Sequence, residues 1–174
     1  MITTLYILCG LPGSGKSTWI DKYLKETGFG IIKPGPFVRV ISRDKVRFSM
    51  INTEAAENND KEYFSREKEV YDEFINRIVE GIEDPYCGIV FADATHVSVG
   101  SRYKLYQAIA RKTKEEYDVV LVWFDVPVEV CKQRNAQREG VARVPDRAID
   151  NMRKHFEFPT LEHKNLIEIK IVRD

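Results

Sequence analysis

The amino-acid sequence carries no net charge, because 27 lysines and arginines balance 27 aspartates and glutamates over its 174 residues. This excludes a global basic field that would steer nucleic acid, so any nucleic-acid binding requires a local patch. Long apolar runs are also missing. No stretch approaches the ~18 apolar residues of a membrane span, and no basic segment precedes the short apolar run near the amino terminus. We therefore expect a soluble, intracellular protein with no membrane contact.

Cysteine and histidine are scarce, with three of each. The odd number of cysteines, their wide spacing and the lack of a C-x-x-C pair argue against a disulfide framework and a zinc site. The histidines do not show the H-E-x-x-H spacing of a zinc peptidase. These absences favour a reducing compartment, which we expect to be the cytoplasm, or the host cytoplasm if a phage encodes the chain.

What the sequence does contain is a glycine-rich phosphate loop. A short apolar run at residues 5–9 leads into GLPGSGKS at 10–17, which matches G-x-x-x-x-G-K-[ST] at every fixed position. Gly10, Gly13 and Gly15 lack a Cβ, so the backbone can take positive φ and turn successive N–H groups toward a phosphate. A chance match in a glycine-rich turn is the alternative, and the strand and helix patterns on either side count against it.

The residues at the end of the loop have the chemistry of a nucleoside triphosphate site. Lys16 is expected to reach the β- and γ-phosphates, and the Ser17 hydroxyl is expected to bind Mg²⁺. The helix that begins near Lys16 adds the positive end of its dipole. We predict that ATP or another NTP binds here with Mg²⁺. The residues assigned to this nucleotide site are Gly10, Pro12, Gly13, Ser14, Gly15, Lys16, Ser17 and, just beyond the direct contacts, Thr18.

Strand and helix patterns alternate along the chain, which predicts one α/β domain over residues 1–174 with a largely parallel central sheet. Strands are expected at 5–9, 37–41, 88–93, 119–125 and, at an edge, 167–171. Helices are expected at 18–25, 62–82, 98–114, 128–139 and 146–156. The segments 28–36 and 52–61 are expected to be a turn-rich connection and a polar loop.

Acidic residues follow two of the predicted strands at their carboxyl ends, where ligands bind in open α/β sheets. Asp44 follows the second strand, and Asp93 ends the third. Phosphoryl transfer suits this arrangement, because its loose transition state needs positioning and positive charge. We predict that Asp44 holds and deprotonates an acceptor hydroxyl and that Asp93 orients the hydrated Mg²⁺. A capping role is the alternative for both carboxylates.

Basic residues supply the positive charge that such a reaction needs. Arg47 lies about one helical turn beyond Asp44 and could bind a second phosphate on the acceptor, the alternative being a solvated surface arginine. Segment 133–147 has several arginines around a glycine-containing loop, which predicts a lid over the triphosphate rather than a solvated basic helix end. These arginines are Arg134, Arg138, Arg143 and Arg147. Thr95 and His96, after the third strand, are weaker candidates.

These segments resemble the kinase domain of phage-type polynucleotide 5′-hydroxyl kinases. The resemblance rests on GLPGSGKSTW at 10–19, SRDKVR at 42–47, DATH at 93–96 and FDVPVEVCKQRNAQREGVARVP at 124–145, and it covers nearly the whole chain. It implies a P-loop kinase-type three-layer fold with a helical lid at about 133–147. It also implies transfer of the γ-phosphate of ATP to the 5′-hydroxyl of a nucleic acid end, as in nucleic acid repair.

The resemblance assigns roles to individual residues. On the nucleotide, Lys16 and Ser17 would hold the phosphates and Mg²⁺. Arg138 and, less directly, Arg134 would contact the NTP phosphates from the lid. Together with Lys16 and Arg138, the general base Asp44 would complete the catalytic set.

On the acceptor, Arg47 would contact the 3′-phosphate of the terminal nucleotide, and Thr95 would lie near the same substrate. No D-x-D-G-T phosphatase motif is present, so a 3′-phosphatase activity is not expected. Two alternatives stay open. One is a P-loop kinase for a small-molecule hydroxyl, such as a nucleoside or sugar. The other is an NTP-driven switch without an acceptor. The sequence does not set the preference for RNA or DNA or the oligomeric state, and a homo-oligomer stays open.

Overall fold

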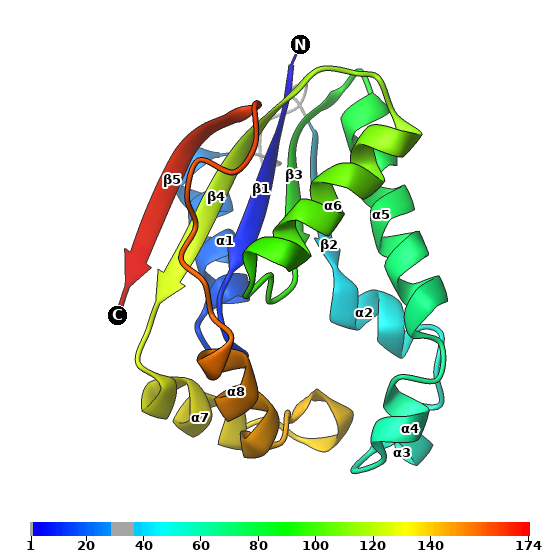
Figure 1. Cartoon of the computed structure of the whole chain (residues 1–174), viewed down its shortest axis with the longest axis vertical. Helices are drawn as coiled ribbons and strands as arrows, with labels where there is room; N and C mark the ends of the chain where they lie inside the picture. Colours follow the sequence, from blue (N-terminus) through cyan, green and yellow to red (C-terminus); the bar gives the residue numbers. More distant parts are fainter. Residues whose placement is uncertain (1, 29–36) are drawn as a thin grey trace.

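The computed structural model describes residues 2–28 and 37–174, so most of the turn-rich segment expected at 28–36 lies outside the described residues. A five-stranded sheet forms the centre of the molecule (Figure 1). All its strand pairs are parallel, and their order is β2-β3-β1-β4-β5. The strands are β1 (Thr3–Cys9), β2 (Phe37–Ser42), β3 (Cys87–Asp93), β4 (Tyr117–Asp125) and β5 (Leu166–Arg173). The predicted α/β fold and its edge position for the last strand are confirmed.

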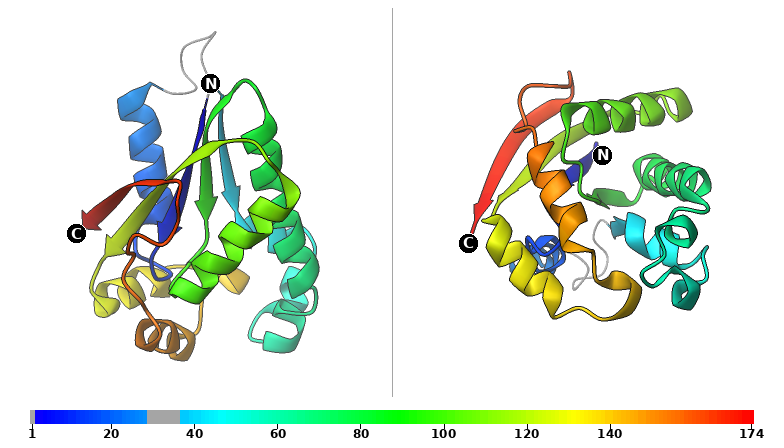
Figure 2. Two further views of the ribbon diagram at one scale, coloured as in Figure 1. Left: turned by 45° about the horizontal axis from the view of Figure 1, so that its top comes forward. Right: turned by 60° about the horizontal axis from the view of Figure 1, so that its bottom comes forward.

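Helices cover both faces of the sheet, which makes three layers (Figure 2). Helix α1 (Lys16–Thr27) lies on one face, and α5 (Glu67–Glu83) and α6 (Val99–Lys112) lie on the other. Successive side chains of β1 point to opposite faces, as the period of a strand requires. Leu5 and Ile7 are buried with α5 and α6, whereas Leu8 is buried with α1. Because both faces are covered, the inner strands β1, β3 and β4 are nearly continuous apolar runs.

The predicted polar loop at 52–61 is wrong, because this stretch contains the short helices α3 (Thr53–Ala56) and α4 (Asp60–Tyr63). Asn52 and Asn59 cap them: their side-chain oxygens accept hydrogen bonds from the backbone N–H groups of Ala55 and Glu62. The helix expected to begin at residue 62 begins instead as α5 at Glu67. Tyr63 of α4 and the following Phe64 continue the helical spacing of α5, although the helix is interrupted between Tyr63 and Glu67.

The helical part of the segment between β4 and β5 lies below the carboxyl ends of the strands in Figure 1. It contains α7 (Val128–Ala136), a 3₁₀ turn η1 (Gly140–Ala142) and α8 (Asp146–Lys154). The predicted helix 128–139 thus ends earlier, at Ala136. Leu11 of the phosphate loop is buried with Cys131 of α7 and Ile149 of α8, which fixes these helices beside the loop. Within the described part of the chain, every helix is too short or too polar to cross a membrane.

Candidate active site

The phosphate loop joins β1 to α1, as the motif predicts. Gly13 and Gly15 have φ values of 83° and 91°, a region that residues with a Cβ rarely adopt. A Cβ on Gly13 would also lie 2.2 Å from the carbonyl oxygen of Cys131. Gly10 differs from the expectation, since its φ is not positive. It is required for space, because its Cβ would lie 2.6 Å from Ser14 Oγ and 2.9 Å from Phe124 Cβ.

Lys16 begins α1 and folds back over the loop. Its Nζ donates to the carbonyl oxygens of Gly10 and Leu11, both at 3.0 Å. Burial lowers the pKa of Lys16, while the carboxylates of Asp93 and Asp44 act in the opposite direction. A half-buried ammonium with only carbonyl partners can turn toward a bound anion at small cost. The geometry therefore fits a lysine that binds phosphate.

Ser17, in the first turn of α1, lies next to Asp93, the last residue of β3. Ser17 Oγ donates to Asp93 Oδ2 at 3.5 Å. Burial raises the pKa of Asp93, and Lys16 and Ser17 oppose that shift. A hydroxyl beside a carboxylate offers the oxygen ligands that Mg²⁺ prefers. Across residues 2–28 and 37–174 no cluster of three or more His, Cys, Asp or Glu could hold a metal, so Mg²⁺ here would need phosphate oxygens as well.

The predicted acceptor side is built from α2 (Arg43–Phe48), α4 and the first residue of α5. Ser42 caps α2, so the capping alternative for Asp44 is not what the structure shows. Arg47 is buried, with 5% of its surface exposed, which is not the solvated surface arginine of the alternative reading. Its Nη1 donates to Asp44 Oδ1 at 2.7 Å, and its Nη2 pairs with Glu67 Oε2 at 2.7 Å.

Tyr63 completes this cluster. Its hydroxyl donates to Asp44 Oδ1 at 3.4 Å and accepts from Arg47 Nη1 at 3.3 Å. Burial and the Asp44 carboxylate raise the pKa of Tyr63, so the phenol keeps its proton as a donor. From the sequence, Tyr63 falls inside the helix predicted at 62–82, and Glu67 has no assigned role. Nothing in the local pattern distinguishes these residues from core and surface positions.

One cavity of about 520 Å³ joins the two sides. Its wall includes Gly13, Lys16, Ser17, Asp44, Arg47, Asp93, Thr95, Arg138, Arg143 and Arg147. Three predicted site residues do not line it. Gly10 and Ser14 are buried residues of the phosphate loop, and Arg134 pairs with Asp174 at 2.5 Å. The lid also reaches the acceptor side, because Arg147 Nη2 pairs with Asp60 Oδ2 of α4 at 2.7 Å.

The loop after β3 is part of the frame under the phosphate loop. The carbonyl oxygen of Thr95 accepts a hydrogen bond of 3.0 Å from Gly10 N. His96 is buried in a left-handed conformation (φ 43°), with its Nδ1 2.9 Å from the Leu8 carbonyl oxygen. Burial lowers the pKa of His96 to about 4. His96 is therefore a neutral structural residue that donates to β1.

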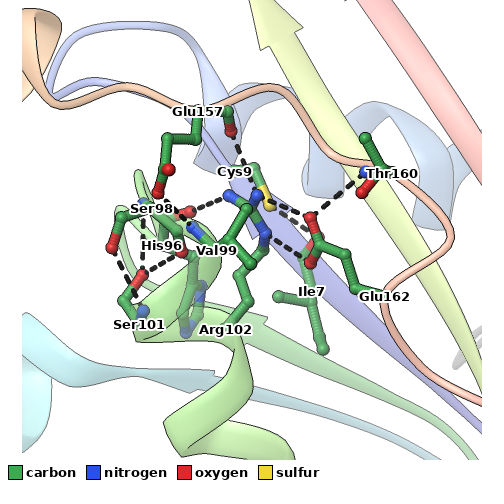
Figure 3. A network of polar contacts seen from close by, with 10 residues as sticks. All are labelled: Ile7, Cys9, His96, Ser98, Val99, Ser101, Arg102, Glu157, Thr160 and Glu162. Carbon is green, nitrogen blue, oxygen red and sulfur yellow. Dashed lines mark hydrogen bonds and ion pairs between the residues drawn. The ribbon is translucent and has the colours of Figure 1, made fainter.

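A buried ion pair anchors this loop from the other side (Figure 3). Arg102 of α6 has no exposed surface and pairs with Glu162 at 2.7 Å. Its Nη1 donates to the His96 carbonyl oxygen at 2.8 Å, and its Nη2 donates to the Glu157 carbonyl oxygen at 3.0 Å. The segment that follows α8 is thus tied to the loop that contacts Gly10. The sequence did not predict this network, because Arg102 and its partner Glu162 are 60 residues apart.

A family model described as an AAA domain, AAA_33, matches residues 5–159. The chain belongs to the AAA_33 family. The matched region contains the phosphate loop, Asp44, Asp93 and the lid arginines, so the whole cavity lies within the family match. No curated protein matches the sequence.

Solved structures share the fold of this AAA_33 member at low sequence identity. A fungal RNA kinase is 9% identical with a TM-score of 0.62, over 99% of this chain and 75% of that chain. Kti12 from Chaetomium thermophilum, in complex with ADP-AlF₃, is 19% identical with a TM-score of 0.58, over 97% and 88%. A gluconokinase from Sinorhizobium meliloti is 14% identical with a TM-score of 0.53, over 97% and 83%. The likeness establishes a P-loop kinase fold and leaves the substrate open.

Proposed function

We propose that this protein is an ATP-dependent polynucleotide kinase of the phage type, acting in nucleic acid repair. It would transfer the γ-phosphate of an NTP to the 5′-hydroxyl of a nucleic acid end. Residues 1–174 would form a single kinase domain with a lid at 133–147. The observation that carries the proposal is the shared cavity, where the phosphate loop faces the Asp44–Arg47 pair.

The donor half would hold the nucleotide through the phosphate loop. Lys16 would exchange the carbonyl oxygens of Gly10 and Leu11 for phosphate oxygens. Ser17 and Asp93 would hold Mg²⁺, which when bound supplies positive charge to the phosphates and the leaving group. Arg138 lines the cavity and would contact the transferred phosphoryl group.

Arg134 is the weaker of the two proposed lid contacts to the NTP phosphates. It pairs with Asp174 outside the cavity wall, so a contact with the nucleotide requires that ion pair to break. Arg138 lines the cavity with no ion pair to any described residue, so nothing has to be broken before it binds an anion. This difference makes Arg138 the lid arginine that we assign to the reaction.

The acceptor half would position the hydroxyl for in-line attack. Asp44 would orient the 5′-hydroxyl and take its proton as the oxygen bonds to the γ-phosphorus and ADP leaves. Arg47 would contact the acceptor's 3′-phosphate through the N–H groups that Asp44, Glu67 and Tyr63 leave free. Thr95 lines the same cavity and would contact the acceptor.

A small-molecule acceptor is the second candidate. Two observations favour it: the zero net charge, which gives no long-range attraction for nucleic acid, and the fold shared with a gluconokinase and a sugar kinase. The segment 42–47, which carries the more specific part of the resemblance to polynucleotide kinases, forms the acceptor wall and favours a nucleic acid end.

An acceptor panel tests the proposal. The purified protein is incubated with Mg²⁺ and γ-labelled ATP and with 5′-OH DNA, 5′-OH RNA, 3′-mononucleotides, nucleosides or gluconate. We expect label on the oligonucleotides and 3′-mononucleotides, and an Arg47→Ala variant with a raised KM for the 3′-phosphorylated acceptors. Label confined to nucleosides or gluconate would overturn the nucleic-acid assignment, and an unchanged KM in Arg47→Ala would count against it.

A further inference from the structure

The Asp44 carboxylate is held through one of its two oxygens. Arg47 Nη1 and the Tyr63 hydroxyl both donate to Oδ1, at 2.7 and 3.4 Å. Over the described residues no group binds Oδ2. The side chain is otherwise open to the cavity, with 57% of its surface exposed. Two donors on the same oxygen fix the rotation of the carboxylate and leave the other oxygen for a ligand.

Arg47 is in turn held from several directions. Its Cζ lies 4.7 Å from the ring centroid of Tyr63 and 5.7 Å from that of Phe64. Glu67 binds its Nη2 through Oε2 and binds Arg43 through Oε1, so one carboxylate spans both arginines. Glu67 is the first residue of α5, where it also benefits from the positive end of the helix dipole.

The charges of this cluster balance. Arg43 and Arg47 provide two positive charges, and Asp44 and Glu67 provide two negative ones. Without Glu67, Arg47 would face Asp44 alone, and it could rotate to form a two-pronged pair that occupies both carboxylate oxygens. Glu67 therefore keeps the second amino group of Arg47 away from Asp44.

We propose that Tyr63 and Glu67 are positioning residues of the acceptor half, which keep Oδ1 of Asp44 occupied and leave Oδ2 to receive the acceptor proton. This inference rests on the proposed function, because it takes Asp44 as the group that binds the acceptor hydroxyl. In the transfer step the proton moves from that hydroxyl to Oδ2, while the hydroxyl oxygen bonds to the γ-phosphorus and the bond to the ADP oxygen breaks. Tyr63 and Glu67 also line the cavity, and in this proposal they act through Arg47 and Asp44, the groups that they bind.

Two conservative variants test the proposal. Tyr63→Phe removes only the hydroxyl, and Glu67→Gln removes only the charge. Matched controls are Tyr103→Phe, an exposed tyrosine of α6, and Glu69→Gln, an exposed residue of α5 that pairs only with Arg66. We expect each test variant to lower kcat for transfer about tenfold, because small misplacements of a reacting group are costly. The KM for ATP and the nucleotide affinity should not change, and the controls should match the wild type.

A merely structural role makes a different prediction. Loss of packing would lower the melting temperature and change nucleotide affinity and kcat together. If Tyr63→Phe and Glu67→Gln keep kcat within twofold of the controls, the positioning role is overturned. Tyr63→Phe keeps the ring contacts with Arg47 and Phe64, so it remains informative even if Glu67→Gln is unstable.

A measurement without substrate separates this proposal from the proposed function. Restricted rotation of the Arg47 guanidinium gives separate ¹H–¹⁵N resonances for its Nη groups at low temperature. We expect these resonances in the wild type and in Glu69→Gln, and their averaging in Glu67→Gln. If the wild type phosphorylates no acceptor but the Arg47 resonances are separate in the wild type and average in Glu67→Gln, the proposed function fails and the positioning geometry stands. Unchanged Arg47 resonances in Glu67→Gln would overturn the positioning role whatever the acceptor.

Discussion

The donor and acceptor sides of the cavity are built in different ways. The donor side is centred on consecutive residues of one loop, whose tight turns depend on Gly13 and Gly15. It lies on a frame that is fully buried, through His96 and Arg102. The acceptor side consists of side chains from α2, α4 and α5, and its proposed base, Asp44, is exposed. A phosphate cradle is thus a local, backbone feature, whereas the acceptor site is assembled by tertiary contacts and ion pairs.

This contrast has an energetic side. Replacement of a buried or conformationally constrained group leaves an uncompensated cost, so changes on the donor side should affect binding and stability together. Ion pairs on exposed side chains contribute little to stability, so replacement of the exposed Asp44 should affect transfer and leave the fold intact.

The largest effect is expected from Lys16→Ala. Removal of the ammonium should lower kcat about 10³-fold, the size of effect seen when a charge-stabilising donor is lost. It should also weaken ATP binding, because Lys16 would contact the phosphates in the ground state as well. Transfer assays and calorimetric titration with ATP measure the two effects. Lys22→Ala, on the exposed face of α1, is the control. Normal ATP affinity in Lys16→Ala would contradict the proposed donor role.

Asp44→Asn should separate the two halves most clearly. We expect kcat to fall about 10²-fold or more, the usual contribution of a general base, while ATP affinity and melting temperature stay at the wild-type level. Asp72→Asn, an exposed α5 position, is the matched control. An Asp44→Asn variant that loses nucleotide binding would show that the two halves are not independent.

Low pH should destabilise the frame under the phosphate loop through protonation of His96. Because burial lowers its pKa to about 4, the unfolded chain binds a proton that the folded protein excludes between this value and the ordinary pKa of 6.5. The stabilising contribution is therefore complete above pH 6.5 and is lost as the pH falls toward 4, in total about 3 kcal/mol. Denaturant unfolding from pH 7 to 4 measures it. His96→Asn, which tolerates the left-handed backbone, should remove this part of the pH dependence. An identical slope in the variant would contradict the assignment.

Substitution of glycines tests the backbone origin of the donor site. Gly13→Ala places a Cβ 2.2 Å from the Cys131 carbonyl oxygen at a φ of 83°. We therefore expect the free energy of unfolding to fall by about 2–3 kcal/mol and ATP binding to weaken. Gly28→Ala has a similar φ of 71°, but none of the described residues lies within 4 Å of its Cβ, so it should lower the free energy of unfolding by about 1 kcal/mol and leave ATP affinity unchanged. Equal effects of the two substitutions would show that close packing against α7 is unimportant.

The smallest effect is expected where the lid meets the acceptor side. Arg147 and Asp60 form an exposed ion pair, with 78% and 61% of their side chains accessible. Arg147→Ala should change the free energy of unfolding by at most about 0.5 kcal/mol, and high salt should abolish the difference. Thermal unfolding at low and high ionic strength measures this. A loss of stability that persists in high salt would mean that the Arg147–Asp60 contact contributes more than a screened electrostatic attraction.

The same contrast explains what the sequence could predict. The strands and most helices were predictable, because apolar runs and helical periodicity are local signals. The start of α5 was not, because Tyr63 and Phe64 fit the helical spacing although the backbone turns before Glu67. Their rings contact Arg47 instead, a contact that no local pattern reveals.

The donor residues were predictable as a motif, whereas the groups that hold the two sides of the cavity in place were not. Glu67 is one of many acidic residues at helix starts, and Arg102 has the spacing of an ordinary helix-surface arginine. Their roles depend on partners 20 and 60 residues away, Arg47 and Glu162, which only the fold brings into contact. Arg134 shows the reverse: the lid pattern predicted a nucleotide contact, and the structure pairs it with Asp174.

The most direct test of the central claim is a single-turnover reaction with γ-labelled ATP, Mg²⁺ and a 5′-OH oligonucleotide, in which ADP and labelled oligonucleotide are counted together. The claim is that both sides of one cavity act on the same phosphoryl group. It predicts one labelled 5′ end for each ADP formed by the wild type. It also predicts no label with Asp44→Asn, although that variant binds ATP normally. ADP formed without a labelled acceptor, or equal labelling by Asp44→Asn, would contradict it.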